Sequence, residues 1–233
     1  MKKNYGTDRF LPFAEGGGST IAIVLLILLL VAVLWLFLPG GLVVDTILFI
    51  VALVAFVVLY FFRDPNRDIV RQAGIVLAPA DGKVVSISRE HEPIYLQDTA
   101  VRVSIFLSVL DIHVQRVPLD GRVLRVDHKP GRFLQAFKPE ASDVNEYIAM
   151  LLETSYGPVL VKQIAGILAR RCVNNAEVGE TVRMGERFGL IKFGSRVDLF
   201  LPLRAEILVK EGEHVYAGLT PLARITSGGE DGN

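Results

Sequence analysis

"IKFGSRVDLFLP", residues 191–202, has the pattern of a strand with an interruption near its start. Its apolar residues alternate with other positions, as expected of a half-buried strand. They are Ile191, Phe193, Val197, Leu199 and Leu201. Gly194 and Ser195 break the alternation. Because glycine weakens a strand and often marks a bulge or a close approach, the pair indicates a specialised backbone position.

Short strand patterns separated by Gly and Pro surround this stretch and fill residues 63–233. Helical periodicity is weak there, so we predict a mainly β, β-rich α+β domain. The predicted strands are residues 84–88, 101–109, 113–117, 121–126, 157–166, 187–193, 195–201, 205–209 and 221–225.

A repeated motif refines this prediction. "GETVRMG" (179–185) and "GEHVYAG" (212–218) share the pattern G-E-x-V-x-x-G. The glycines suit tight turns and the central valine suits a core, which is typical of barrel-sandwich hybrid folds. Ser195 lies between the copies. A chain break there would leave the second copy on a fragment, 195–233, whose strands could stay paired in the parent sheet.

Two long apolar segments precede the β domain, at residues 20–38 and 42–62. Each is long enough to cross a hydrocarbon core of roughly 30 Å. The short connection between them predicts an antiparallel, membrane-embedded helical hairpin over 20–62. No small-residue cleavage site follows the first segment, which argues against a secretory signal peptide. Asp45 lies beside the turn, where lipid head groups could solvate it.

Positive charges flank the hairpin and predict its orientation. Lysine and arginine favour the cytoplasmic side of a membrane. We therefore expect residues 1–19 and the domain 63–233 on the cytoplasmic side of the cell membrane. The flanking charges are Lys2, Lys3 and Arg9 before the hairpin, and Arg63, Arg67 and Arg71 after it.

Composition limits the partners and cofactors. The 233 residues carry a formal net charge of +0, so no basic excess is available for nucleic acid. The single cysteine, Cys172, cannot form an intrachain disulfide, and we expect it to be buried. The sequence holds no familiar metal-ligand motif or phosphate-binding loop, so we predict neither a metal site nor an external cofactor.

Three interpretations of Ser195 compete. A hydrolase nucleophile calls for G-x-S-x-G between a strand and a helix, and "FGSRV" lacks the second glycine. A structural bulge requires no further residues around the Gly-Ser pair. In the third interpretation, the Ser195 hydroxyl attacks the Gly194 carbonyl. The resulting ester eliminates to dehydroalanine, which hydrolyses to ammonia and an N-terminal pyruvoyl group.

Six sequence blocks favour the third interpretation. In order they are "FFRDPNR" (61–67), "APADGKV" (78–84), "FLSVLDIHVQRVPLDG" (106–121), "KPGRFLQAFKPEASDVNE" (129–146), "KQIAGILARR" (162–171) and "GLIKFGSRVDLFLP" (189–202). Together they resemble the phosphatidylserine decarboxylase proenzymes, specifically the short class with an N-terminal hydrophobic segment.

The resemblance implies cleavage between Gly194 and Ser195, giving a β chain, 1–194, and an α chain, 195–233, that begins with a pyruvoyl group made from Ser195. The pyruvoyl ketone would form a Schiff base with the amine of phosphatidylserine and accept the electrons released with carbon dioxide, yielding phosphatidylethanolamine. The expected partners are a phospholipid substrate in the membrane and the two chains of one precursor. Pairing into a homodimer is also expected.

The resemblance also suggests roles for three further residues. Asp81, in the turn "PADG", is a candidate to orient or deprotonate the group that activates Ser195. His113 is a candidate to protonate the substrate carbanion. Longer bacterial relatives have a second histidine, linked to self-cleavage, where this chain has Arg116. Two assignments stay open: His113 serves both stages, or Arg116 stabilises charge at the substrate site while Asp81 is the base.

Two other functions fit parts of the sequence. The same chemistry could act on an ether-linked archaeal-type phosphatidylserine, since no residue pattern identifies the lipid tails. A non-enzymatic, membrane-tethered hybrid-barrel adaptor or carrier would explain the repeat and "PADGKV". It would not require Gly194-Ser195.

Overall fold

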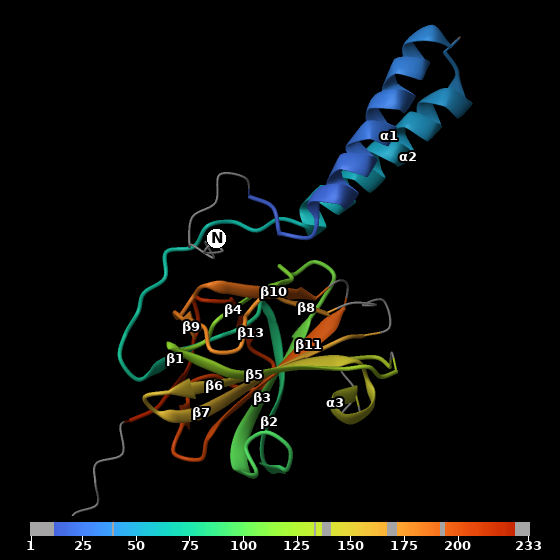
Figure 1. Ribbon diagram of the computed structural model, residues 1–233. Helices are drawn as coiled ribbons and strands as arrows, with labels where there is room; N and C mark the ends of the chain where they lie inside the picture. Colours follow the sequence, from blue (N-terminus) through green and yellow to red (C-terminus); the bar gives the residue numbers. More distant parts are fainter. Residues whose placement is uncertain are drawn as a thin grey trace, which may run out of the picture. The chain divides into compact units, whose positions relative to one another are not determined.

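The computed structural model describes residues 12–38, 40–132, 134–136, 141–166, 172–191 and 194–226. The chain forms two compact units, one that ends at Pro65 and one that begins at Asn66. Figure 1 shows a helical hairpin in the first and a β-rich unit in the second, which confirms the predicted fold class. Lys2, Lys3 and Arg9, used to predict orientation, lie outside the described residues.

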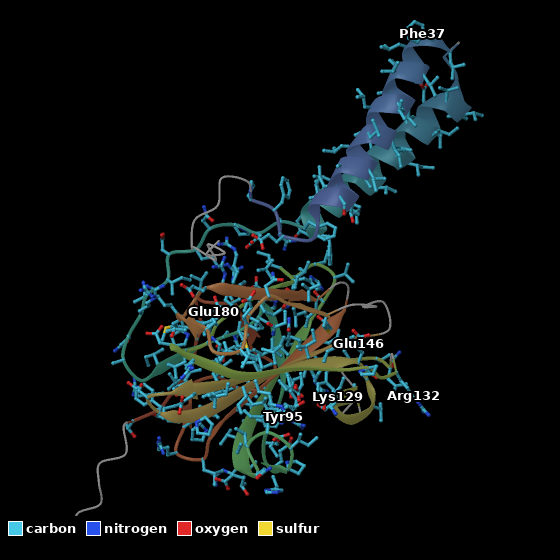
Figure 2. The ribbon with its side chains drawn as sticks, viewed as in Figure 1. Phe37, Tyr95, Lys129, Arg132, Glu146 and Glu180 are labelled. Atoms are coloured by element: carbon cyan, nitrogen blue, oxygen red, sulfur yellow. The ribbon has the colours of Figure 1, made fainter. Side chains whose placement is uncertain are left out.

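The hairpin consists of α1 (Gly18–Phe37) and α2 (Leu42–Phe61). Each helix has 20 residues, which corresponds to about 30 Å at the α-helical rise. Their mean hydropathies are 3.2 and 3.0, and the side chains project outward, including Phe37 at the end of α1 (Figure 2). Length and composition therefore suggest that this unit associates with a membrane.

Polar contacts hold the hairpin together at both of its ends. Trp35 Nε1 donates a hydrogen bond to Asp45 Oδ1 at 2.7 Å. Asp45 also lies in the first turn of α2, where the helix dipole favours a negative charge. At the other end, the Ala14 N–H donates to the Phe62 carbonyl at 2.8 Å. Asp45 therefore has a partner on the facing helix.

The β unit is built around one antiparallel eight-stranded sheet, which curls around its core in Figure 1. In spatial order its strands are β13 (His214–Val215), β2 (Gly82–Glu92), β3 (Asp98–Leu107), β11 (Ser195–Pro202), β7 (Gly157–Ile164), β6 (Tyr147–Thr154), β5 (Gly121–Lys129) and β9 (Thr181–Val182). A short helix, α3 (Ala141–Val144), lies between β5 and β6 in the sequence.

Two three-stranded sheets complete the unit. One has the order β4 (Val114–Arg116), β10 (Arg187–Ile191), β8 (Cys172–Asn174). The other has the order β1 (Ile75–Leu77), β14 (Pro221–Arg224), β12 (Glu206–Ile207). Apolar side chains from all three sheets form one buried core. Burial of such side chains is the main favourable term in folding, so this core fixes the positions of the strands.

The two copies of the repeat occupy equivalent places at opposite ends of the large sheet. In the first copy β9 pairs with the start of β5, and in the second β13 pairs with the start of β2. The four bounding glycines all have positive φ: Gly179 (88°), Gly185 (84°), Gly212 (90°) and Gly218 (71°). Other residues rarely adopt this conformation, which explains the glycines of the motif.

Each copy packs against a second repeated motif, P-x-D-G-[KR]-V, at residues 79–84 and 118–123. The hydrogen bonds correspond. The Val84 N–H donates to the Glu213 carbonyl at 2.8 Å, and the Val123 N–H donates to the Glu180 carbonyl at 2.8 Å. The β unit therefore contains two matching halves related by an internal duplication.

Residues 191–202 do not form one interrupted strand. Ile191 ends β10 in a three-stranded sheet, whereas Ser195 begins β11 in the eight-stranded sheet. Gly194 lies where the chain passes from one sheet to the other. The Gly-Ser pair is thus a junction between sheets rather than a bulge inside a strand.

Candidate active site

Ser195 is enclosed at the start of β11. It pairs with Leu107 of β3, and its side chain is on the same face of the strand as Val197 and Leu199, which belong to the core. The residue is 0% exposed, and within the described part of the chain its Oγ has no hydrogen-bond partner. A buried hydroxyl without a partner is costly, so such a group calls for a functional explanation.

The carbonyl of Gly194 is held in a close contact. Gly194 has a φ of 56°, in the left-handed region that favours glycine. A Cβ added to Gly166 would overlap the Gly194 oxygen and lie 3.1 Å from the Gly194 carbonyl carbon. Only a glycine at position 166 lets the two backbones approach in this way. The missing side chain of Gly166 therefore leaves the space that is occupied by the carbonyl that Ser195 would attack.

A buried ionic cluster fixes the residue that follows Ser195. Arg196 Nε lies 2.9 Å from Asp198 Oδ1, and Arg196 Nη2 donates to Asp198 Oδ2 at 3.0 Å. Ser142, from α3, donates from Oγ to Asp198 Oδ2 at 2.6 Å and also bonds Arg196 Nη2. Arg196 Nη1 donates to the Ala136 carbonyl at 3.1 Å. These contacts join the first residues of β11 to α3 and to the segment before it.

Asn145 anchors the segment that supplies Ala136. Its Oδ1 accepts the Leu134 N–H at 2.8 Å, and its Nδ2 donates to the carbonyls of Leu134 and Ala165 at 2.8 and 2.7 Å. Ala165 precedes Gly166, so this one side chain joins the segment before α3 to the segment against Gly194. In Figure 2 the labelled Arg132 and Glu146 lie at the same end of the unit.

His113 is buried directly before β4, which pairs with β10, the strand that leads toward Gly194. Its Nδ1 lies 2.9 Å from the carbonyl oxygen of Asp111. A carbonyl only accepts, so Nδ1 carries the hydrogen and a neutral ring has its lone pair on Nε2. His113 therefore has the tautomer of a base that acts through Nε2.

Two buried amides support the His113 backbone. Gln115 Nε2 donates to the His113 carbonyl at 2.7 Å, and Gln163 Nε2 donates to Gln115 Oε1 at 2.9 Å. Asn174 Nδ2 in turn donates to Gln163 Oε1 at 3.1 Å. The chain of amides links β4, β7 and β8 around His113. A fully satisfied buried network of this kind restricts the position of each member.

Asp81 lies in the turn before β2 and is bound on several sides. Arg67 donates to both of its carboxylate oxygens at 2.6 and 2.8 Å, and the Ala217 N–H donates to Oδ1 at 2.8 Å. Its duplicate, Asp120, accepts the Met184 N–H at 2.6 Å. In each half, the aspartate thus holds the turn of the G-E-x-V-x-x-G motif. These contacts do not join Asp81 to Ser195.

Arg116 is almost fully buried, and its Nη1 donates to the Gly185 carbonyl at 3.0 Å. This location at the repeat motif does not favour contact with a lipid head group. The roles predicted for Arg116, Asp81 and His113 stay predictions. Of these residues, His113 lies beside β10, the strand that leads toward Ser195. Asp81 is hydrogen-bonded to the G-E-x-V-x-x-G motif.

A second buried ion pair lies on the same face of the large sheet as Asp198. Lys162 Nζ lies 3.2 Å from Glu92 Oε1 and 4.9 Å from the Phe200 ring centroid. Burial opposes ionisation of Glu92, but the backbone N–H groups of Leu96 and Tyr95, with Lys162, outweigh it and lower the pKa of Glu92. This pair joins β2 to β7 on the face of the sheet that also carries Asp198.

The sequence pattern missed the cluster around Arg196. In a half-buried strand, the alternation along residues 195–201 would place Arg196 and Asp198 on the solvent face. Both are buried, because α3 and the segment before it cover that face. The blocks at 129–146 and 162–171, which carry the family resemblance, contain Ser142, Asn145 and Gly166. These blocks are the sequence signal that could have identified the three residues.

Comparison with known proteins shows which family this chain resembles in sequence. The sequence profile of the phosphatidylserine decarboxylase family matches residues 54–223. A phosphatidylserine decarboxylase proenzyme of Salinibacter ruber is 50% identical over 172 residues, which is 72% of this chain and 75% of the relative. One from Prosthecochloris aestuarii is 40% identical over 213 residues, covering 91% of this chain and 97% of the relative. One from Nocardia farcinica is 48% identical over 170 residues, or 71% and 72%.

Proposed function

Because this chain belongs to the phosphatidylserine decarboxylase family, and is therefore a decarboxylase, we propose that it cleaves itself between Gly194 and Ser195 and uses a pyruvoyl group made from Ser195. The substrate is phosphatidylserine in a membrane, and the products are phosphatidylethanolamine and carbon dioxide. This function replaces the adaptor alternative, because the relatives are named as enzymes.

The observation that carries this proposal is the buried, unpartnered Ser195 Oγ beside a constrained Gly194 carbonyl. Self-cleavage requires a nucleophile and a carbonyl carbon that stay close without solvent between them. Gly166 leaves room for the Gly194 carbonyl, and the Arg196–Asp198–Ser142 cluster holds the strand that carries the nucleophile. The site is thus arranged for a reaction within the chain.

The proposed cleavage balances without an external reagent other than water. Ser195 Oγ bonds to the Gly194 carbonyl carbon, and the bond from that carbon to the Ser195 nitrogen breaks. Loss of the Ser195 α-proton then expels the Gly194 carboxylate from Cβ and leaves dehydroalanine. Water replaces its nitrogen, which departs as ammonia, and the pyruvoyl ketone remains. This ketone supplies an electron sink for decarboxylation.

His113 is our candidate for proton transfer. The Asp111 carbonyl holds its Nδ1–H, so Nε2 is the atom available to take or return a proton. Asp81 is our candidate for orientation, because Arg67 and the Ala217 N–H already bind its carboxylate. In this scheme Asp81 positions the turn before β2, and His113 serves the chemical steps.

We further propose that the enzyme works at the cytoplasmic side of the cell membrane. The two apolar helices support membrane association, and Arg63, at the end of the hairpin, supports the cytoplasmic orientation. Arg67 and Arg71 contribute less to this argument than the sequence suggests. Arg67 binds Asp81, and Arg71 Nε donates to the Met184 carbonyl at 3.2 Å. The homodimer stays a prediction.

Ser195→Ala tests the proposed function directly. We expect the variant to remain one chain and to release no carbon dioxide from carboxyl-labelled phosphatidylserine in vesicles. Ser104→Ala is a matched control, because Ser104 Oγ on β3 is also buried and, within the described residues, also lacks a hydrogen-bond partner. It should cleave and turn over normally. Carbon dioxide release by Ser195→Ala would refute the pyruvoyl mechanism.

A second variant separates the two stages. We expect His113→Gln to lose lipid turnover. If the variant still cleaves, His113 acts in turnover alone, and if it stays uncut, His113 also serves self-cleavage. Full turnover in His113→Gln would rule out the proton-transfer role.

A further inference from the structure

Residues 108–112, in the connection between β3 and β4, link the two candidate catalytic positions. This loop begins after Leu107, the residue paired with Ser195, and ends before His113. Two consecutive apolar side chains lie at its tip: Val109 is 41% exposed and Leu110 is 68% exposed. Isolated exposed apolar residues are common. Two adjacent ones close to a buried candidate site need an explanation.

Hydrogen bonds hold this tip in one conformation. Asp111 Oδ2 accepts both the N–H and the Oγ–H of Ser108 at 2.7 Å, and the Asp111 N–H donates to the Ser108 carbonyl at 3.0 Å. Ile112 is buried behind the turn. The loop therefore holds Val109 and Leu110 in a fixed position. Little conformational entropy of the loop is lost when these side chains bind a partner.

A neighbouring turn extends the same surface. His214 Nε2 lies 2.9 Å from Asp111 Oδ1, and its ring lies 5.0 Å from that of Tyr216. Tyr216 is 50% exposed, and the turn that it begins continues to Leu219, which is also exposed. We call these four residues, Val109, Leu110, Tyr216 and Leu219, the apolar rim.

We propose that the apolar rim docks onto the phospholipid bilayer and brings the lipid head group to Ser195. This inference rests on the proposed function. The acyl chains of a phospholipid stay in the bilayer, whereas the candidate site is fully buried in the β unit. Leucine and valine fit the boundary between head groups and acyl chains, and tyrosine is enriched at that boundary.

The point where the chain enters the β unit lies beside the rim. Arg67, two residues after the end of the hairpin unit, donates from Nη1 to the Ala217 carbonyl at 2.6 Å, next to Tyr216. The first residues of the β unit are therefore fixed next to the rim. The rim itself combines aliphatic side chains with a half-exposed tyrosine, a composition that suits a bilayer surface more than a soluble protein partner.

The test uses the full chain with a fluorescent label at one introduced cysteine, in a Cys172→Ser background. Position 110 reports on the rim, and position 203 is the matched control. Leu203 is 45% exposed and follows β11 at the end opposite Ser195. Both variants, Leu110→Cys and Leu203→Cys, keep the hairpin, so both proteins are attached to the vesicle in the same way.

The labelled proteins are placed in vesicles of phosphatidylcholine and phosphatidylserine that contain a head-group-proximal nitroxide lipid. We expect a blue-shifted emission and strong quenching at position 110, and neither at position 203. Equal, weak quenching at both positions would overturn the inference. A blue shift at position 110 could also occur without lipid quenching and depend on protein concentration. That result would show contact between copies of the chain and would also overturn the inference.

Activity provides a second readout. For Leu110→Asp, the ratio of turnover on vesicle phosphatidylserine to turnover on dispersed short-chain phosphatidylserine should fall about tenfold, because one exposed leucine no longer enters lipid. An unchanged ratio would contradict docking. Each variant is first checked for its two fragments. Absent fragments count against the proposed function, whereas normal fragments with an unchanged ratio count against the rim alone.

Discussion

Gly166→Ala tests whether the Gly194 carbonyl is held for attack. The added Cβ would overlap the Gly194 oxygen, lie 3.1 Å from the Gly194 carbonyl carbon and lie 3.3 Å from the Ala136 Cβ. The added Cβ would meet atoms on two sides. One of the two backbones must therefore move by on the order of 1 Å to remove the overlap. A displacement of that size in a reacting pair costs about 100-fold in rate. We expect self-cleavage to slow by about that factor.

The assay is a pulse-labelled time course on denaturing gels, in which the uncut chain should persist for Gly166→Ala. Gly121→Ala is the control, because its Cβ would also press on a carbonyl, 2.7 Å from the Glu153 oxygen, at the start of β5. This variant should lose stability but cleave at the normal rate once folded. Normal cleavage of a folded Gly166→Ala would refute the role of Gly166.

Four further outcomes follow from buried groups. Lys162→Met should lower the free energy of unfolding by about 3–5 kcal/mol, measured by urea titration, because it leaves Glu92 as a buried charge. The Glu92 pKa is lowered in the fold, so its carboxylate stabilises the protein above the unfolded-state value of 4.5. That contribution is lost as the pH falls through the folded-state pKa, and Glu92→Gln should flatten the acid limb of the stability curve. Burial, with the charge of Glu146, raises the pKa of Cys172, so iodoacetamide should alkylate it at pH 8 only after unfolding. Ser142→Ala should slow self-cleavage, measured on gels, since it removes one bond to Asp198 and one to Arg196.

Local sequence features predict much of the fold. The hairpin follows from two uninterrupted apolar runs, and most strands follow from alternation bounded by Gly and Pro. The G-E-x-V-x-x-G repeat predicts the tight turns beside β9 and β13, because its glycines have the positive φ that such turns require. Strand β6, Tyr147–Thr154, is not predicted, since its apolar run "YIAMLL" lacks the two-residue period. It is buried on both faces along most of its length, so no alternation marks it.

The site was only partly accessible from the sequence. Gly194 and Ser195 are conspicuous because they break a local pattern. Gly166 and Asn145 act through contacts with segments distant in sequence, and no local period reveals such contacts. Asp81 shows the converse limit. The family resemblance suggested a chemical role for Asp81, whereas its duplicate Asp120 shows that the same turn motif also serves the fold.

The intact mass of the purified, active protein tests the central claim most directly. The account predicts two chains, residues 1–194 and 195–233, with the smaller one lighter by one ammonia molecule than a fragment that begins with serine. One unbroken chain of 25.7 kDa in fully active protein would contradict it.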